Sequence, residues 1–129
     1  MTNPSDTTLL VVEDEFLIAL GLELILQDAG YHVLEPVTTI EEALAVVATQ
    51  PADLALLDVN LAGHQVYPVA DALASKNVPY IFLSGCEESD LPPRFAGVRL
   101  LVKPFSADKL LNAIRQVLGD GEQVALRAT

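Results

Sequence analysis

The sequence of 129 residues has little cysteine, no tryptophan and few positive charges. Its one cysteine, Cys86, excludes a disulfide within the chain, so a reducing compartment, the cytoplasm, is the expected location. No apolar run approaches the ~20 residues of a membrane-spanning helix, and no basic start precedes an apolar stretch as in a signal peptide. Hydrophobic residues make up 51% of the chain and charged residues 19%, which argues for a folded core rather than disorder.

Positive charge is missing from more than half of the chain. The formal net charge is −11, and the twelve carboxylates before Lys76 are accompanied by no Lys or Arg. Proteins that bind nucleic acids need clustered cations to contact phosphates, so this composition argues against nucleic acid as a partner. The first half of the chain is instead expected to engage cations or protein surfaces.

Two kinds of segment alternate along the chain. Apolar runs that predict strands lie at Thr7–Val12, Tyr31–Val37, Asp53–Asp58, Val78–Ser84 and Val98–Val102. Pro36 marks the second of these as an edge strand or places its end early. Helical patterns lie at Glu15–Ala29, Ile40–Gln50, Val66–Lys76 and, after an N-cap at Ser106, up to Gly119. Such alternation predicts an α/β fold in which a parallel sheet is covered by helices on both faces. We expect an ordered core at about 8–119, with loose termini at 1–7 and 120–129.

Chemically active side chains follow four of the five predicted strands. Glu13 and Asp14 follow the first strand, Asp58 ends the third, Ser84 ends the fourth and Lys103 follows the fifth. Because functional sites of such sheets lie beyond the carboxyl ends of the strands, we expect these side chains to converge. Two carboxylates ~4 Å apart repel each other by roughly 4 kcal/mol near a protein surface, so a proton or a cation must lie between them. A few carboxylates suit Mg²⁺.

Four motifs carry a resemblance to a known family: VVEDE, LALLDVNLAG, IFLSG and VKPF, in this order. Through them the chain resembles, from Leu9 to Leu118, the receiver domain of two-component response regulators. The resemblance implies a single receiver domain over residues 1–129, a doubly wound five-stranded parallel sheet with the flavodoxin-like strand order 2-1-3-4-5, and helices on both faces. It also implies a signalling phosphoprotein rather than an enzyme with a separate substrate.

The resemblance assigns a role to each residue of the predicted site. Asp58 would accept a phosphoryl group from a sensor histidine kinase or a phosphotransfer protein, and would assist its own Mg²⁺-dependent transfer and slow dephosphorylation. The implied ligands of Mg²⁺ are Glu13, Asp14, Asp58 and the backbone carbonyl of Asn60. Ser84 and Lys103 would contact the phosphoryl oxygens, and the peptide bond before Pro104 would be cis. Asn60 also borders the expected path of water in dephosphorylation.

The expected signal is passed on through contacts with another protein. Since the chain ends where the resemblance ends, we expect no output domain, no membrane contact, an unknown downstream protein, and a monomer or weak dimer. Movement of Ser84 toward the phosphoryl group would displace the loop that follows it.

The sequence departs from the family at two places. Leu100 occupies the position, three residues before Lys103, where most receivers carry Tyr or Phe, so a rotating aromatic switch is not expected. The segment between Ser84 and Lys103 is short and contains Pro92-Pro93, which excludes a regular helix there. It is similar to an alphaproteobacterial subgroup of stand-alone receivers with an altered fourth-strand motif. We predict that Gly85–Ala96 is mobile and that phosphorylation orders it.

The first predicted helix is apolar on two sides. One face, suited to the sheet, consists of Ile18, Leu22, Ile25 and Leu26. A second face, on the far side, consists of Leu17, Leu20 and Leu24. A helix that is apolar all round is either buried on both sides or meets a partner. We expect this second face to contact the kinase, although packing against another element of the chain would explain it equally well.

Other interpretations of the pattern exist. Asp58 could merely cap a turn, and Glu13 and Asp14 could merely favour the positive end of a helix. An alternative function is a Mg²⁺-dependent phosphatase with an aspartate nucleophile. Such an enzyme carries the nucleophile at the end of its first strand, whereas Asp58 ends the third. A flavodoxin-like cofactor binder needs a loop that attracts phosphate where this chain has three acids. An interaction module that is never phosphorylated would not need the acid, hydroxyl and lysine set. Cys86, His32 and His64 suggest no chemistry.

Overall fold

The computed structural model describes residues 4–85 and 91–128, with residues 120–128 described by their backbone alone. Five strands form the main sheet: β1 (Thr8–Val12), β2 (His32–Val33), β3 (Leu54–Asp58), β6 (Tyr80–Ser84) and β7 (Leu100–Val102). The helices are α1 (Phe16–Asp28), α2 (Ile40–Thr49), α3 (Tyr67–Ser75) and α4 (Ala107–Ala128). Short elements complete the chain: the 3-10 helices η1 (Pro4–Asp6) and η3 (Pro93–Phe95), and the strands β4 (Asn60–Leu61) and β5 (His64–Gln65).

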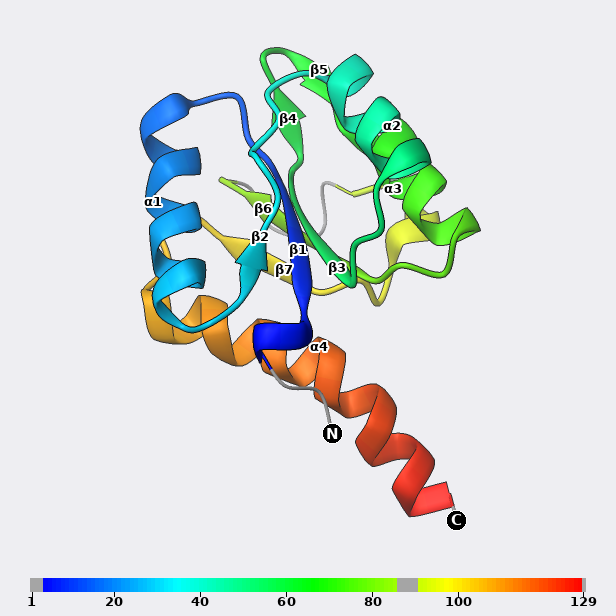
Figure 1. The fold of residues 1–129 in the computed structure, drawn as a ribbon. Coiled ribbons are helices and arrows are strands. Elements are labelled where there is room, and N and C mark those ends of the chain that lie inside the picture. Colours follow the sequence, from blue (N-terminus) through cyan, green and yellow to red (C-terminus); the bar gives the residue numbers. More distant parts are fainter. Residues whose placement is uncertain (1–3, 86–90, 129) are drawn as a thin grey trace.

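All neighbouring strands of the main sheet are parallel, in the order β2-β1-β3-β6-β7 (Figure 1). This order confirms the predicted flavodoxin-like topology. β3 is central, and all five of its residues are buried, as expected for a continuous apolar run with helices on both sides. Because β1 and β3 are direct neighbours, the residues that follow Val12 and those that end β3 lie at the same edge of the sheet.

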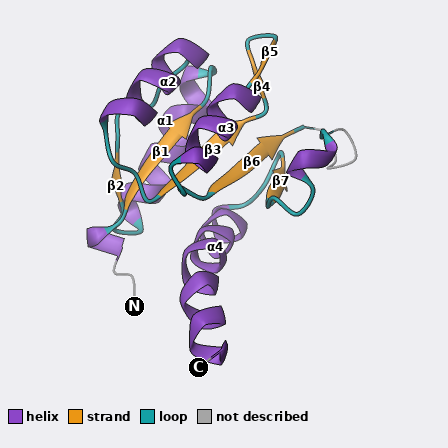
Figure 2. Ribbon diagram, turned by 90° about the vertical axis from the view of Figure 1, so that its right-hand side faces the viewer, coloured by secondary structure: helices purple, strands orange, loops and turns teal. Residues whose placement is uncertain are grey.

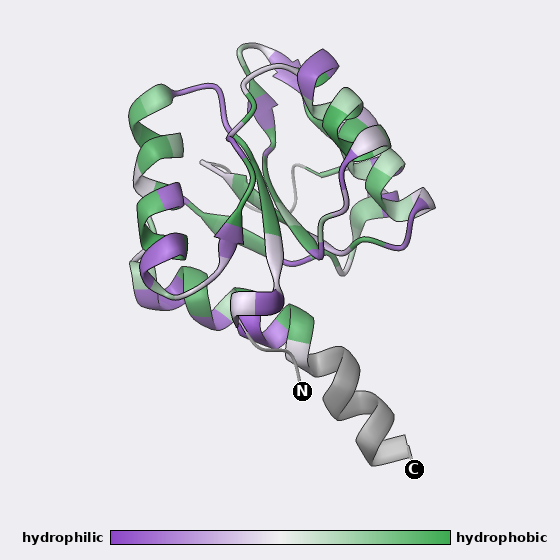
Figure 3. Cartoon of the chain, viewed as in Figure 1, coloured by the Kyte–Doolittle hydropathy of each residue, from purple (hydrophilic) through white to green (hydrophobic). Residues whose placement is uncertain are grey.

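The sheet separates two hydrophobic layers (Figures 1 and 2). On one face, α1 and α4 pack through residues such as Leu22, Leu26 and Ile114. On the other face, α2 and α3 pack through residues such as Val47 and Leu73. Successive residues of β1, β3 and β6 alternate between the layers, so the middle of each of these strands is apolar (Figure 3). Each fully buried leucine contributes about 1.5–3 kcal/mol to this arrangement.

Local signals explain where the helices begin. The Thr39 hydroxyl accepts a hydrogen bond from the Glu42 backbone N–H at 3.1 Å and thereby caps the start of α2. The Ser106 hydroxyl accepts one from the Lys109 N–H at 3.1 Å at the start of α4. Pro68 lies in the first turn of α3, where no N–H is needed.

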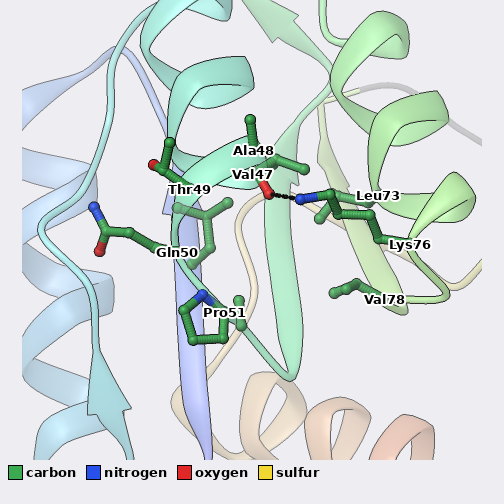
Figure 4. Close-up of a pocket in the computed structure, with 10 residues that line it drawn as sticks. Val47, Ala48, Thr49, Gln50, Pro51, Leu73, Lys76 and Val78 are labelled. Carbon is green, nitrogen blue, oxygen red and sulfur yellow. Dashed lines mark hydrogen bonds between the residues drawn. The ribbon is translucent and has the colours of Figure 1, made fainter.

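A cavity of about 360 Å³ lies between the C-terminal ends of α2 and α3 (Figure 4). The Lys76 ammonium crosses it and donates a hydrogen bond of 2.7 Å to the Val47 carbonyl. In a continuing helix that carbonyl would accept from residue 51, but Pro51 has no N–H. Lys76 therefore stabilises the end of α2 by satisfying a carbonyl that proline leaves without its usual donor.

Four segments differ from the sequence-based expectation. β2 has two residues rather than seven, and beyond it only Val37 forms an isolated bridge with Val12. Pro36 explains this shortness, because it cannot donate to the ladder. The residues after Asp58 form the hairpin β4–β5, which was not predicted. The last helix continues past Gly119 to Ala128, and η1 occupies part of the expected loose start.

The predicted mobility of Gly85–Ala96 concerns a segment that includes residues 86–90, which lie outside the described residues. Its later part holds η3, in which Phe95 is buried. None of the helices in the described part of the chain combines the length and the apolar character that crossing a membrane requires.

Candidate functional site

Three carboxylates converge at the carboxyl edge of the sheet, at the top of Figure 1. Glu13 and Asp14 follow β1, Asp58 ends β3, and each offers an oxygen within 4.8 Å of the others. Glu13 is completely buried and Asp58 nearly so. The structure therefore brings together the three acids that the sequence predicted as a cluster.

Lys103 supplies the positive charge that this cluster needs. It follows β7, and its Nζ atom lies 3.0 Å from Oε2 of Glu13 and 3.3 Å from Oδ2 of Asp58. The second oxygen of Glu13 accepts the backbone N–H of Glu15 at 3.2 Å. The buried charge of Glu13 is thus compensated by one ammonium and one peptide dipole. The sequence predicted Lys103 beside the phosphoryl group, but not its bond to Glu13.

The effect of the clustered charges is clearest in the pKa of Asp58. Burial, followed by the hydrogen bond and the charge of Glu13, raises the pKa of Asp58 from 3.8 to about 7, and Lys103 only partly offsets this. Burial disfavours the charged form of Lys103, but its hydrogen bonds to Glu13 and Asp58 and their charges raise its pKa overall. Burial and the neighbouring Glu13 therefore hold back the ionised form of Asp58.

The donor set fits a hard dication. Mg²⁺ is held by one or two carboxylates together with waters and phosphate oxygens, and Glu13, Asp14 and Asp58 offer carboxylate oxygens close enough to share one ion. A cation bound here would favour the ionised form of Asp58, against the burial and the charge of Glu13 that raise its pKa. The chemistry of the residues thus agrees with the magnesium site implied by the sequence.

Asn60 is held in place by the hairpin. Its backbone N–H donates to Oδ1 of Asp58 at 3.3 Å, and its side-chain oxygen accepts the Gly63 N–H at 3.0 Å. Ala62 and Gly63 form the two-residue turn, with φ of 52° and 86°. The side chain of Asn60 thus stabilises the turn. The sequence analysis had predicted only that Asn60 borders the path of water in dephosphorylation, and it did not predict this structural role.

Ser84 lies beside Lys103 at the same edge. It is the last residue of β6, its side chain is buried, and its carbonyl accepts the Lys103 N–H at 2.7 Å. The preceding residue, Leu83, is the register partner of Asp58. The peptide bond between Lys103 and Pro104 is cis. The hydroxyl and the ammonium thus follow neighbouring strands, next to the strand that carries Asp58.

An aromatic cluster lies below Ser84 on the α3 side of the sheet. Phe95 of η3 is buried, and its ring centre lies 5.0 Å from that of Tyr67 and 5.2 Å from that of Phe82. The guanidinium of Arg94 lies over the Phe95 ring at 4.5 Å and pairs with Asp71 at 3.2 Å. Leu100, where the family usually has an aromatic residue, packs against the same layer.

The second apolar face of α1 is exposed. Leu17, Leu20 and Leu24 have 78%, 37% and 57% of their surface accessible. Phe16, which the sequence analysis did not single out, extends this face and is 71% exposed. The opposite face packs on the sheet as predicted, with Leu22 and Leu26 buried. No described residue covers the second face, so packing within the described part of the chain does not explain it.

Comparison with known proteins identifies a family. Residues 9–115 match the family described as response regulator receiver domain. The chain is 31% identical over 109 residues to the transcriptional regulatory protein PdtaR of Mycobacterium tuberculosis, a match that covers 81% of this chain and 53% of PdtaR. This chain therefore spans about half the length of the curated relatives it matches.

Solved structures agree. The solution structure of SdrG from Sphingomonas melonis Fr1 is 39% identical, with a TM-score of 0.77 over 87% of this chain and 96% of SdrG. The structure titled as the BeF3-activated conformation of SdrG, from Pseudomonas melonis Fr1, is 37% identical, with a TM-score of 0.76 over 92% of this chain and 99% of that chain. These neighbours support the resemblance to the alphaproteobacterial subgroup.

Proposed function

The chain belongs to the response regulator receiver domain family of two-component systems, and we propose that it is a phosphoacceptor whose Asp58 takes a phosphoryl group from a sensor histidine kinase or a phosphotransfer protein. The observation that carries this proposal is the convergence of Glu13, Asp14 and Lys103 on Asp58. The neighbour titled as a BeF3-activated conformation supports it, because that relative responds to a phosphoryl analogue.

In this proposal Asp58 is the nucleophile. An oxygen of its carboxylate forms the new bond to phosphorus while the bond between phosphorus and the donor's histidine nitrogen breaks, and the nitrogen then gains a proton. Lys103, already 3.3 Å from Oδ2 of Asp58, would neutralise charge on the transferred group. Ser84 would donate its hydroxyl to a phosphoryl oxygen. Later attack of water on phosphorus would break the bond to the Asp58 oxygen, release inorganic phosphate and return Asp58 to its resting state.

Mg²⁺ is the cofactor we propose for this site. Glu13, Asp14, Asp58 and the carbonyl of Asn60 would hold it. When bound, it supplies positive charge that favours the ionised form of Asp58 and balances the oxygens of the incoming group. The hairpin β4–β5 and the bond from Gly63 to the Asn60 side chain would keep the carbonyl of Asn60 in place.

Phosphorylation would be transmitted through protein contacts. The exposed apolar face of α1 consists of Phe16, Leu17, Leu20 and Leu24, and it begins two residues after Asp14. A phosphodonor that covers this face therefore lies next to the edge of the site. We propose this face as the contact with the kinase.

Ser84 and the segment after it would form the part that moves on phosphorylation and that a downstream protein recognises.

The test of this function is direct. The purified protein is incubated with acetyl phosphate and Mg²⁺ and its intact mass is measured. A gain of one phosphoryl group is expected, lost in Asp58→Asn and prevented by EDTA. A chain that gains no phosphoryl group under these conditions would be an interaction module instead. Steady turnover of p-nitrophenyl phosphate would indicate a phosphatase.

A further inference from the structure

The cavity between the C-terminal ends of α2 and α3 lies away from the acidic cluster. Ala52 and Val78, which line it, each lie two residues before a strand, β3 and β6. The cavity therefore opens toward the amino edge of the parallel sheet, opposite the edge that carries Asp58. Its volume of about 360 Å³ falls in the range of sites for small molecules, roughly 300–1,000 Å³.

The wall on the side of α3 is held by the end of that helix. The Val78 N–H donates to the Leu73 carbonyl and the Asn77 N–H to the Ala74 carbonyl, each at 3.0 Å, which is a Schellman motif. Asn77 has the left-handed backbone that this motif needs, with φ of 60°. Lys76 lies at the C-cap, and its side chain crosses the cavity to the opposite wall (Figure 4).

The wall on the side of α2 and the floor are apolar. Val47 is buried, and Ala48 and Pro51 lie with it across from Lys76 in Figure 4. Leu10 of β1, also buried, supplies the floor between the two helices. An apolar molecule placed here would cover surface that water now contacts, which is favourable.

The charge in this cavity is positive. Lys76 is the one charged residue of the described lining, and it is the first basic residue after twelve acids in the sequence. No described carboxylate lies within ion-pair distance of its ammonium. An ammonium has three donors, of which the Val47 carbonyl accepts one at 2.7 Å. Two donors and an unpaired positive charge therefore face a ligand.

The carbonyls at the two helix ends could weaken this attraction for an anion, because the C-terminal end of a helix is partly negative. Four of these carbonyls already accept hydrogen bonds, those of Val46, Val47, Leu73 and Ala74. Their negative ends are thus covered by donors of the chain itself. The charge of Lys76 is therefore the main one that an approaching ligand meets.

We propose that this cavity binds a small monocarboxylate with a short aliphatic body, whose oxygens accept hydrogen bonds from Nζ of Lys76. One ammonium balances one negative charge, which favours a carboxylate over a phosphate ester, whose charge is close to two. At about 30 Å³ for each water-sized group, the cavity holds roughly ten non-hydrogen atoms. The inference does not depend on phosphorylation of Asp58.

The experiment is a titration of the full chain, labelled with nitrogen-15, with isocaproate while the amide NMR spectrum is recorded. Two matched probes are isocaproamide, which has the same shape without the charge, and inorganic phosphate, which has charge without an apolar body. Isocaproate should give saturable shifts at Ala48, Leu73 and Val78, with a Kd on the order of 1 mM. Both matched probes should bind at least about tenfold more weakly.

Two variants separate the ligand site from the stability of the fold. Lys76→Met removes the charge, whereas Ala52→Leu fills the cavity and leaves the bond from Lys76 to Val47 in place. Each should weaken isocaproate binding at least about tenfold. Lys109→Met removes a lysine of α4 that does not line the cavity, and should bind as the unaltered protein does. The melting temperature of each variant shows that it is folded.

Several results would overturn the inference. They are shifts that do not saturate, shifts centred on Asp58, equal binding of isocaproamide, or tighter binding of phosphate. Unchanged binding by Ala52→Leu or by a folded Lys76→Met would overturn it as well. If Lys76→Met does not fold, Ala52→Leu decides, because it keeps the lysine and its hydrogen bond.

Discussion

The ammonium of Lys103 lies 3.0 Å from Oε2 of Glu13, a carboxylate with no exposed surface. These two residues come from opposite ends of the sequence and follow β1 and β7, strands that are separated in the sheet by β3 and β6. The pair therefore ties the edge of the sheet together in addition to serving the proposed chemistry. Removing one partner of such a pair leaves a buried charge without compensation.

Replacement of Lys103 should consequently affect stability and phosphorylation together. We expect Lys103→Met to lower the free energy of unfolding by about 2 kcal/mol, because Glu13 stays buried. Phosphorylation by acetyl phosphate should slow roughly a hundredfold, because a positive charge beside the transferred group is lost. Urea unfolding and intact mass measure the two effects. Lys109→Met, an exposed change in α4, is the control; an equal effect of both variants would contradict the role of Lys103.

The pKa of Asp58 predicts how stability depends on pH. Because this pKa is raised from 3.8 to about 7 by burial and by Glu13, the folded state keeps a proton that the unfolded chain has lost between these values. Stability should therefore fall as pH rises through this window. Without divalent ions, we expect the free energy of unfolding to drop by ~2 kcal/mol between pH 5 and pH 8.

Asp58→Asn removes this titration, so its stability should change less over the same range and exceed that of the unaltered protein at pH 8. Mg²⁺ at millimolar concentration should restore stability at pH 8 only where Asp58 is present. Urea titrations at both pH values, with and without EDTA, measure this. If the two proteins lose stability in parallel, Asp58 is not the group that titrates.

Leu20→Glu tests the exposed face of α1 by charge rather than by shape. A carboxylate in an apolar contact must lose its water, so transfer from the kinase should slow at least tenfold. Phosphorylation by acetyl phosphate should be unchanged, because Leu20 does not reach the acids. Ala45→Glu places the same charge on the exposed side of α2 and should have no effect. Equal loss with both phosphodonors would rule out a contact surface.

Lys76→Met should weaken the fold without affecting phosphorylation. The variant keeps the length of the side chain but cannot donate to the Val47 carbonyl, which Pro51 leaves without a helix partner. One net hydrogen bond corresponds to about 1 kcal/mol of unfolding free energy. Thermal or urea unfolding measures it. Unchanged stability would mean that water replaces the ammonium at that carbonyl.

Much of the fold could be predicted because the pattern of several segments fits only one type of secondary structure. The apolar runs of β3 and β6 are too short for helices and too continuous for exposed strands, and they alternate with helical patterns. Pro36 correctly indicated that β2 is an edge strand that ends early, but its apolar pattern extends beyond its hydrogen bonds, so the end at Val33 could not be located. The β4–β5 hairpin was missed because two-residue strands such as Asn60–Leu61 have no detectable period. The last helix was expected to end at Gly119, but a single glycine is tolerated within a helix.

The site was predictable to the extent that topology determines it. Residues at the ends of β1, β3, β6 and β7 must share one edge, which is enough to assemble Glu13, Asp58 and Lys103. Which oxygen Lys103 contacts depends on side-chain packing, and no sequence pattern records that. The exposure of Phe16 was equally hidden, because a residue type does not indicate what lies next to it.

The sheet divides the hydrophobic interior into two layers that share no residue, one under α1 and α4 and one under α2 and α3. Substitutions more than ~7–10 Å apart without common partners usually add in their effects on stability. Changes that accumulate under one pair of helices should thus show little epistasis with changes under the other pair. Over evolutionary time, the layer beneath the proposed donor surface on α1 should therefore diverge independently of the layer beneath α2 and α3.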